Sequence, residues 1–244
     1  MKNEDDFFVG YLPTPPNVAK RMKRIVAALA ISIVAIAATV GIAQHGFAHS
    51  RFEFGRYRAF EGVLLERPYP MLLVVRPGNT RRASPFSVYL LVDQFKHGAD
   101  DRVRGLHGQR VSLEGELIYR EGSSMLELKP GSIQKINPAD SSAAPILMPF
   151  GPLTLTGEIV DSKCYLGVMN PGNGKVHRDC AARCVSGGVP AALVTSTKGQ
   201  PGAVFLLQSA IGKLPQNIVE HAGEQLSLSG EGLAVGDQRF LILR

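Results

Sequence analysis

Hydrophobic positions follow two different patterns along the chain. From Ile25 to Ala43 they form an unbroken apolar run without a charged residue. A helix of that length rises roughly 28 Å, which is close to the thickness of a bilayer core. Farther along, apolar and polar residues alternate in short segments, as in VSLE at 111–114, and this is the period of a half-buried strand. The pattern therefore predicts a membrane helix followed by a β-rich region.

The β-rich region contains an internal repeat. Residues 107–130 align with residues 221–244, and upstream FEGVLLERPYP at 60–70 resembles LTGEIVDSKCY at 155–165. Each half predicts three strands, a short helical connection and two further strands, which is the element order of an OB-type barrel. In the first half the predicted elements are strands at 57–66, 70–76 and 86–93, a helical connection at 95–106, and strands at 109–119 and 123–129.

The predicted fold class is mainly β, with two tandem OB-like five-stranded barrels after an N-terminal transmembrane helix. A stretch rich in Pro, Ser and Ala separates the two halves and is typical of a linker. The predicted parts are a cytoplasmic leader at 1–24, the transmembrane helix at 25–44, a first OB-like domain at 53–136, a linker at 137–152 and a second OB-like domain with a Cys/His insertion at 153–244.

Basic residues before the apolar run predict the orientation in the membrane. Arg21, Lys23 and Arg24 precede it, so the positive-inside rule places the N-terminus in the cytoplasm. We therefore expect a single-pass protein of a bacterial inner membrane, held in lipid by residues 25–44, with periplasmic or extracellular C-terminal domains. A cleaved signal peptide is the alternative, but the leader and the apolar run are both long for one. In either case the domains lie in an oxidising compartment, where thiols tend to pair or bind metal.

Charge and motifs exclude several classes of function. The net charge is +6, but part of it lies before the apolar run, and no Lys/Arg stripe alternates with aromatic residues. The sequence therefore predicts no nucleic-acid partner. It also lacks a nucleophile elbow, a glycine-rich phosphate loop and an HExxH motif. These observations favour an accessory protein over an enzyme, with a protein partner at the membrane.

All three cysteines of the chain lie in one short segment together with a histidine. Cys164, His177, Cys180 and Cys184 have the spacing C-x12-H-x2-C-x3-C, where the first repeat has only a short corner between its first two strands. The residues HRDCAARC favour a helix, which would place the last three of these side chains on one face. The turn-forming residues at 171–174 would bring Cys164 back toward that face.

Three interpretations of this segment remain open. Three thiolates and an imidazole form a tetrahedral set suited to zinc, with copper or an iron–sulfur cluster as alternatives. A disulfide from Cys164 to one helical cysteine would staple the insertion and leave one thiol free. The third interpretation is an exported thiol oxidoreductase with a reactive Cys/His pair. Nearby cations are expected to lower the thiol pKa values, and these are Lys163, Lys175, Arg178 and Arg183.

The stretch DSKCYLGVMNPGNGKVHRDCAARC resembles a segment of uncharacterised bacterial membrane-anchored exported proteins. In that family a D-S-x-C strand end is followed by H-x-x-C-A-x-x-C. The resemblance covers residues 155–243 and implies an OB-like exported module without a known activity. Its motif residues are Cys164, His177, Cys180 and Cys184, with Asp161 and Ser162 at the strand end. Together these observations predict a metal-binding accessory protein with a structural or assembly role in a membrane redox or metal-handling system.

Overall fold

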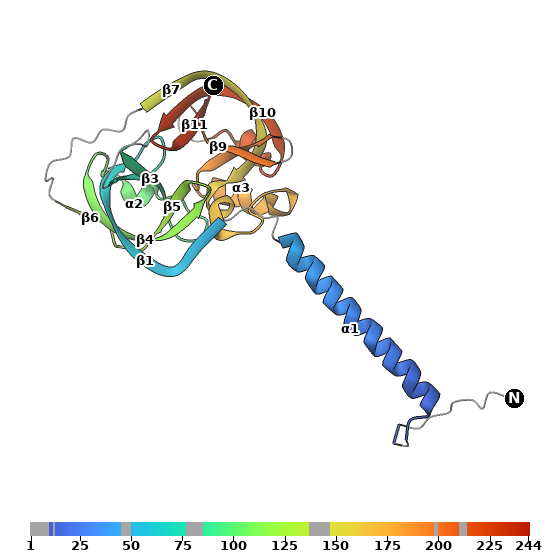
Figure 1. Cartoon of the computed structure of the whole chain (residues 1–244). Helices are drawn as coiled ribbons and strands as arrows, with labels where there is room; N and C mark the ends of the chain where they lie inside the picture. Colours follow the sequence, from blue (N-terminus) through green and yellow to red (C-terminus); the bar gives the residue numbers. More distant parts are fainter. Residues whose placement is uncertain are drawn as a thin grey trace. The chain divides into compact units, whose positions relative to one another are not determined.

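The computed structural model describes residues 10–11, 13–44, 50–76, 85–136, 147–197, 200–209 and 214–244. Residue contacts divide the chain into two compact units, 1–48 and 49–244 (Figure 1). The first unit holds the N-terminal helix. The second unit holds both halves of the repeat.

The N-terminal unit is built on helix α1 (Pro16–Gln44). Its segment Pro16–Ala43 is long and apolar enough to cross a membrane, and it could be a membrane anchor or a signal sequence. The helix begins well before the predicted start at residue 25. Proline is favourable at the first helical position, and the Ala, Lys, Arg and Met residues that follow have high helix propensity. The basic residues before the apolar run are therefore part of the same helix.

The first barrel is formed by β1 (Ser50–Leu65), β2 (Met71–Val75), β3 (Phe86–Val92), β4 (Arg110–Arg120) and β5 (Ser123–Leu128), with helix α2 (Asp100–Val103) and the short strand β6 (Gln134–Lys135). The strand order is β1-β2-β3-β5-β4, and β4 pairs back with β1 to close the barrel. Strands β3 and β5 are parallel, and the other neighbours are antiparallel. The helix predicted at 95–106 is confined to the single turn of α2.

The second barrel repeats this topology with β7 (Leu147–Asp161), β8 (Ala191–Thr197), β9 (Gln200–Ser209), β10 (Gln225–Val235) and β11 (Gln238–Leu243), and with helix α4 (Gln216–Glu220) between β9 and β10. It closes in the order β10-β11-β9-β8-β7, again with one parallel pair, β9 and β11. The predicted mainly β fold with two tandem OB-like barrels is confirmed. Strand β7 includes the end of the predicted linker at 137–152, and residues 137–146 lie outside the described residues.

Matching glycines allow both barrels to close tightly. A Cβ atom on Gly62 of β1 would lie 2.3 Å from the carbonyl oxygen of Leu73, and one on Gly157 of β7 would lie 2.4 Å from that of Val194. Both distances are shorter than any van der Waals contact, so only glycine fits where the first strand of each barrel bends against the second. These two glycines occupy equivalent positions in the repeat.

The second barrel carries an insertion between β7 and β8, at the predicted place. We define the insertion as residues 162–190. It contains a π-helical turn (Cys164–Val168), a 3-10 turn (Lys175–His177) and helix α3 (Arg178–Ser186). Its apolar residues belong to a core that is shared with both barrels. That core includes Leu73, Leu90 and Met125 of the first barrel, Tyr165, Leu166 and Cys184 of the insertion, and Leu206 and Phe240 of the second barrel.

Candidate metal centre

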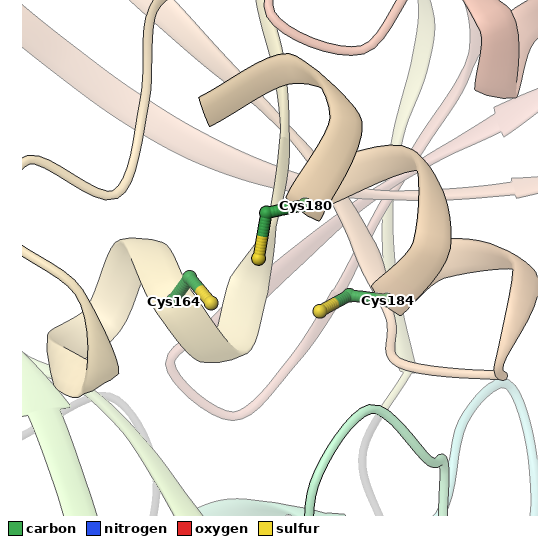
Figure 2. A group of neighbouring side chains, drawn as sticks. All are labelled: Cys164, Cys180 and Cys184. Carbon is green, nitrogen blue, oxygen red and sulfur yellow. The ribbon is translucent and has the colours of Figure 1, made fainter. Parts of the chain in front are cut away.

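The three cysteines converge at the junction between the insertion and the first barrel. Figure 2 shows the sulfur atoms of Cys164, Cys180 and Cys184 pointing toward one another, and all three lie within 4.8 Å of each other. We call these residues the thiol cluster. Cys164 and Cys184 are 4% and 2% exposed, and Cys180 is partly exposed. All three are free thiols in the structure.

Local sequence explains how the cysteines reach this arrangement. Cys180 and Cys184 stand one turn apart on α3, which contains no glycine or proline and ends at Gly187. Cys164 lies three residues after Asp161, the last residue of β7, and its backbone N–H donates to Oδ1 of Asp161 at 2.8 Å. This side-chain cap turns the chain sharply after the strand, as short polar side chains do at helix starts. The cap therefore directs Cys164 toward α3.

His177 joins the site through Asp161. The ring nitrogen Nε2 of His177 and Oδ2 of Asp161 are 2.8 Å apart, and the two residues are 3% and 0% exposed. Ligand atoms of Asp161, Cys164 and His177 also lie within 4.8 Å of one another. The structure therefore brings three of the four predicted ligands together, and His177 belongs to a second group, with Asp161, that shares Cys164 with the first. Either group could hold a metal ion.

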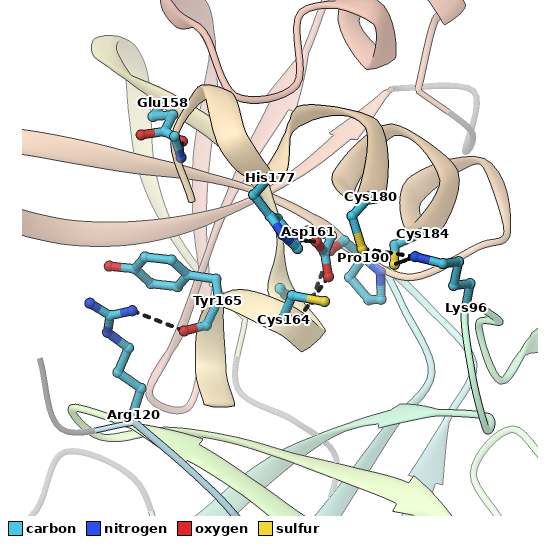
Figure 3. A network of polar contacts seen from close by, with 12 residues as sticks. Lys96, Arg120, Glu158, Asp161, Cys164, Tyr165, His177, Cys180, Cys184 and Pro190 are labelled. Carbon is cyan, nitrogen blue, oxygen red and sulfur yellow. Dashed lines mark hydrogen bonds and ion pairs between the residues drawn. The ribbon is translucent and has the colours of Figure 1, made fainter. Parts of the chain in front are cut away.

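Lys96 of the first barrel completes the thiol cluster, and sequence reasoning missed it. Its Nζ atom lies 2.8 Å from Sγ of Cys180 and 3.7 Å from Sγ of Cys184 (Figure 3). Lys96 is 84 positions from Cys180, so no local spacing connects the two residues. Only the docking of the insertion on the first barrel brings the ammonium group to the sulfurs.

Lys163 has a different role from the predicted one. It was expected to lower thiol pKa values, but its Nζ atom pairs with Oε2 of Glu127 at 2.5 Å and donates to the carbonyl oxygens of Asp93 and Phe95 at 2.9 and 2.6 Å. The side chain is 3% exposed. All three partners belong to the first barrel, so Lys163 fastens the insertion to that barrel.

The thiols influence each other's protonation. The pKa of Cys184 is lowered to about 7, chiefly by a hydrogen bond with Cys164 and to a smaller extent by Lys96, against the opposing effect of burial. The same hydrogen bond raises the pKa of Cys164, and burial of the thiol raises it as well. The hydrogen bond to Cys180 raises the pKa of Lys96, so this lysine stays charged. The site therefore favours a thiolate on Cys184 beside a thiol on Cys164.

Replacing Lys96 with methionine is expected to weaken metal binding about tenfold at neutral pH. The ammonium group lowers the pKa of Cys184, so its loss raises that pKa, and protons then compete more strongly with the metal. The pH at which binding is half complete should rise. Chelator competition from about pH 6 to about pH 8 measures this shift. Lys129→Met is the control, because Lys129 is a half-exposed lysine of the same barrel that pairs with Glu114. Equal pH profiles for Lys96→Met and the unmodified chain would contradict the prediction.

The spacing of the thiol cluster suits a soft divalent ion. Sulfur ligands bind zinc at about 2.3 Å in a tetrahedron, which separates neighbouring sulfurs by roughly 3.8 Å. Sulfurs within 4.8 Å need to move by only about 1 Å or less to reach that geometry. The arrangement is thus compatible with a metal ion without repacking of the barrels.

Searches of the chain against protein-family models, curated proteins and solved structures gave no significant match. The resemblance to exported bacterial proteins therefore stays a prediction from the motif residues.

Proposed function

We propose that this chain is a membrane-anchored, exported accessory protein that binds one zinc ion through Cys164, Cys180, Cys184 and His177. One observation carries the proposal: three buried or partly buried thiols converge within 4.8 Å around a lysine ammonium group. Three thiols that converge beside an ammonium group form the kind of environment that favours thiolates, which are the metal-binding form of cysteine.

Charge balance favours a divalent ion. Three thiolates with a dication carry one net negative charge, which the Lys96 ammonium group compensates, and the buried carboxylate of Asp161 adds a second negative charge. A copper(I) ion would leave a further negative charge in the same buried space. An iron–sulfur cluster is usually held by four cysteines, and this chain has three.

The pair Asp161–His177 supplies the fourth ligand in this proposal. A carboxylate that accepts the Nε2–H of a histidine fixes the ring orientation and leaves the Nδ1 lone pair for a metal. Asp161 is fully buried, and both of its oxygens are engaged, one by His177 and one by the N–H of Cys164. It therefore positions two ligands at once.

Replacing Asp161 with asparagine should weaken zinc affinity by about 10- to 100-fold while one ion per chain still binds at saturation. Such losses are typical when the partner of a metal-binding histidine is removed. Asparagine keeps the acceptor for the Cys164 N–H, so the fold should be retained. Affinity measured with a fluorescent zinc chelator checks the prediction. Asp179→Asn, an exposed position on helix α3, should leave affinity unchanged. An unaltered affinity in Asp161→Asn would mean that His177 does not bind the metal.

The same geometry supports a structural rather than a catalytic ion. Catalytic zinc sites keep a position open to water, whereas four protein ligands fill the coordination sphere. In this proposal the ion holds the insertion together where it joins the two barrels. With α1 as a retained anchor and its basic residues in the cytoplasm, the barrels project on the far side of a bacterial inner membrane. There the protein would support assembly of a redox or metal-handling system together with a protein partner.

Elemental analysis of the detergent-solubilised full chain tests the proposed function. We expect one zinc ion per chain, and three thiols that react with a thiol reagent only after chelation and unfolding. The outcome against the proposal is a chain without stoichiometric metal in which mass spectrometry finds one disulfide and one free thiol. That result would establish the stapled, metal-free interaction module instead. A metal-free chain with a rapidly alkylated thiol would point to thiol–disulfide exchange.

A further inference from the structure

A second candidate site lies between the barrels, separate from the thiol cluster. It is a cavity of about 260 Å³ lined by the β4–β5 turn of the first barrel, by Tyr165 of the insertion, and by β9 and the β10–β11 turn of the second barrel. We call it the inter-barrel cavity. Every part of the compact unit contributes to its wall, so its shape depends on the docking of the barrels.

Three buried side-chain polar atoms of residues that line this cavity have no hydrogen-bond partner in the protein. They are Nε of Arg120, Oη of Tyr165 and Nε2 of Gln238. Buried polar side-chain atoms are nearly always paired, and each exception calls for an explanation. In the part of the chain that the structure describes, these three are the only such atoms, and all three residues line the same cavity. Their coincidence in one place indicates a ligand rather than three separate packing defects.

The side chains that carry these atoms are held in place. Tyr165 and Gln238 are 2% and 4% exposed. The guanidinium carbon of Arg120 lies 4.0 Å from the centre of the Tyr165 ring, and its NH1 group donates to the carbonyl oxygen of Tyr165 at 3.0 Å (Figure 3). The Nη1 group of Arg120 therefore has a hydrogen-bond acceptor within the protein, whereas its Nε–H group has none. A site organised in this way loses little conformational entropy when it binds a ligand.

The unpaired atoms define the chemistry of the ligand. Nε of Arg120 and Nε2 of Gln238 can only donate hydrogen bonds, and a tyrosine hydroxyl can donate a third. The ligand must therefore present acceptors. The two oxygens of a carboxylate can accept from a guanidinium N–H and from an amide N–H at the same time.

Charge around the cavity favours a monoanion. No carboxylate forms an ion pair with Arg120 within the described ranges, and Asp237 at the rim is paired with Arg76 at 2.8 Å. Arg239 and Glu121, also at the rim, carry opposite charges. One positive charge is thus left to compensate. A phosphate dianion would bring more charge and more acceptors than these groups can satisfy.

At roughly 30 Å³ for each water-sized group, the volume suits a ligand of about nine non-hydrogen atoms or fewer.

We propose that the inter-barrel cavity binds a small monocarboxylate. One carboxylate oxygen accepts from Nε of Arg120, the other accepts from Nε2 of Gln238, and the hydroxyl of Tyr165 donates to either oxygen. The remainder of the ligand lies against Ala203 and Val204 of β9. None of the four proposed zinc ligands takes part, so this site can be present whether or not the thiol cluster holds a metal.

Saturation-transfer NMR and thermal-shift measurements on the full chain in detergent test the proposal. The probes are sodium acetate, lactate and benzoate, with sodium chloride and sodium phosphate at equal ionic strength as comparison salts. At least one carboxylate should show saturation transfer and raise Tm in a saturable manner, and the two comparison salts should not. Failure of all three carboxylates, or an equal response to phosphate, would overturn the proposal.

Tyr165→Phe separates binding from stability. This change removes only Oη, which has no partner in the protein, so Tm without ligand should stay the same or rise, while carboxylate affinity falls about tenfold. Tyr69→Phe is the matched control, because its hydroxyl donates to the carbonyl oxygen of Leu207. The control should lose stability and keep its affinity. Full carboxylate affinity in the Tyr165→Phe chain would show that Oη does not bind the ligand. Destabilisation like that of the control would show that Oη has a structural role. Either result would refute the site.

Gln238→Met provides a second test of the same site. Methionine has a similar volume and no N–H donor, so it should also lower carboxylate affinity about tenfold without reducing Tm. Unchanged carboxylate affinity in this variant would refute the assigned binding geometry.

Discussion

Replacing Cys180 and Cys184 together with serine will abolish stoichiometric metal binding and lower Tm by roughly 8–16 °C. Serine hydroxyls are not ionised at neutral pH and are poor zinc ligands, so only Cys164 and His177 would remain. An ion that binds only the native state at about a thousand times its Kd contributes about 4 kcal/mol to the free energy of unfolding. In a chain of 150–250 residues, each kcal/mol corresponds to about 2–4 °C in Tm.

Metal analysis and thermal unfolding with and without a strong chelator measure this effect. The chelator should lower Tm of the unmodified chain by about the same amount and leave the double variant unchanged. Ala182→Ser is the matched control, because it introduces a serine into the same helix α3 away from the sulfurs. The prediction fails if the double variant retains one ion per chain, or if the chelator has no effect on the unmodified chain.

Replacing Lys163 with methionine will lower Tm by roughly 6–20 °C with the metal site still intact. Lys163 is 3% exposed and pairs with Glu127, which is 12% exposed. Removing one partner of a buried ion pair leaves the other charge uncompensated and costs about 3–5 kcal/mol. Each kcal/mol again corresponds to about 2–4 °C in Tm. Two backbone carbonyl oxygens of the first barrel would lose their donor as well.

Thermal unfolding of a matched set of variants isolates this contribution. Lys175→Met alters an exposed lysine of the same insertion and should change Tm very little. Adding Glu127→Met to Lys163→Met removes the unpaired carboxylate and should restore part of the lost stability, because both charges are then replaced by apolar groups. A Lys163→Met chain as stable as the Lys175→Met chain would show that the ion pair contributes nothing.

The fold was predictable from the sequence because its signals are local and occur twice. Strand alternation and turn residues are read from neighbouring positions, and the repeat supports each element with a second copy. The same local reasoning placed Cys180 and Cys184 on one helical face. It was less successful at boundaries, where the start of α1 and the first residues of β7 extend past the predicted limits.

The parts of the site that were missed depend on docking. Lys96 reaches the sulfurs only because the insertion packs on the first barrel, and no periodicity in the sequence encodes that contact. Lys163 was assigned to the thiols because it is adjacent to Cys164, but its side chain extends to the first barrel instead. Asp161 was recognised at the strand end, and the structure adds its hydrogen bonds to both Cys164 and His177.

The core shared by the two barrels has a consequence for biosynthesis. Leu73, Leu90 and Met125 of the first barrel pack against residues that are made later, including Tyr165 and Phe240. While the chain is being synthesised, the first barrel therefore exposes an apolar face until the insertion and the second barrel emerge. A chain truncated before β7 would keep that face uncovered and would be prone to aggregation. The N-terminal copy of the repeat thus has part of its core covered only when the copy that follows it has been made.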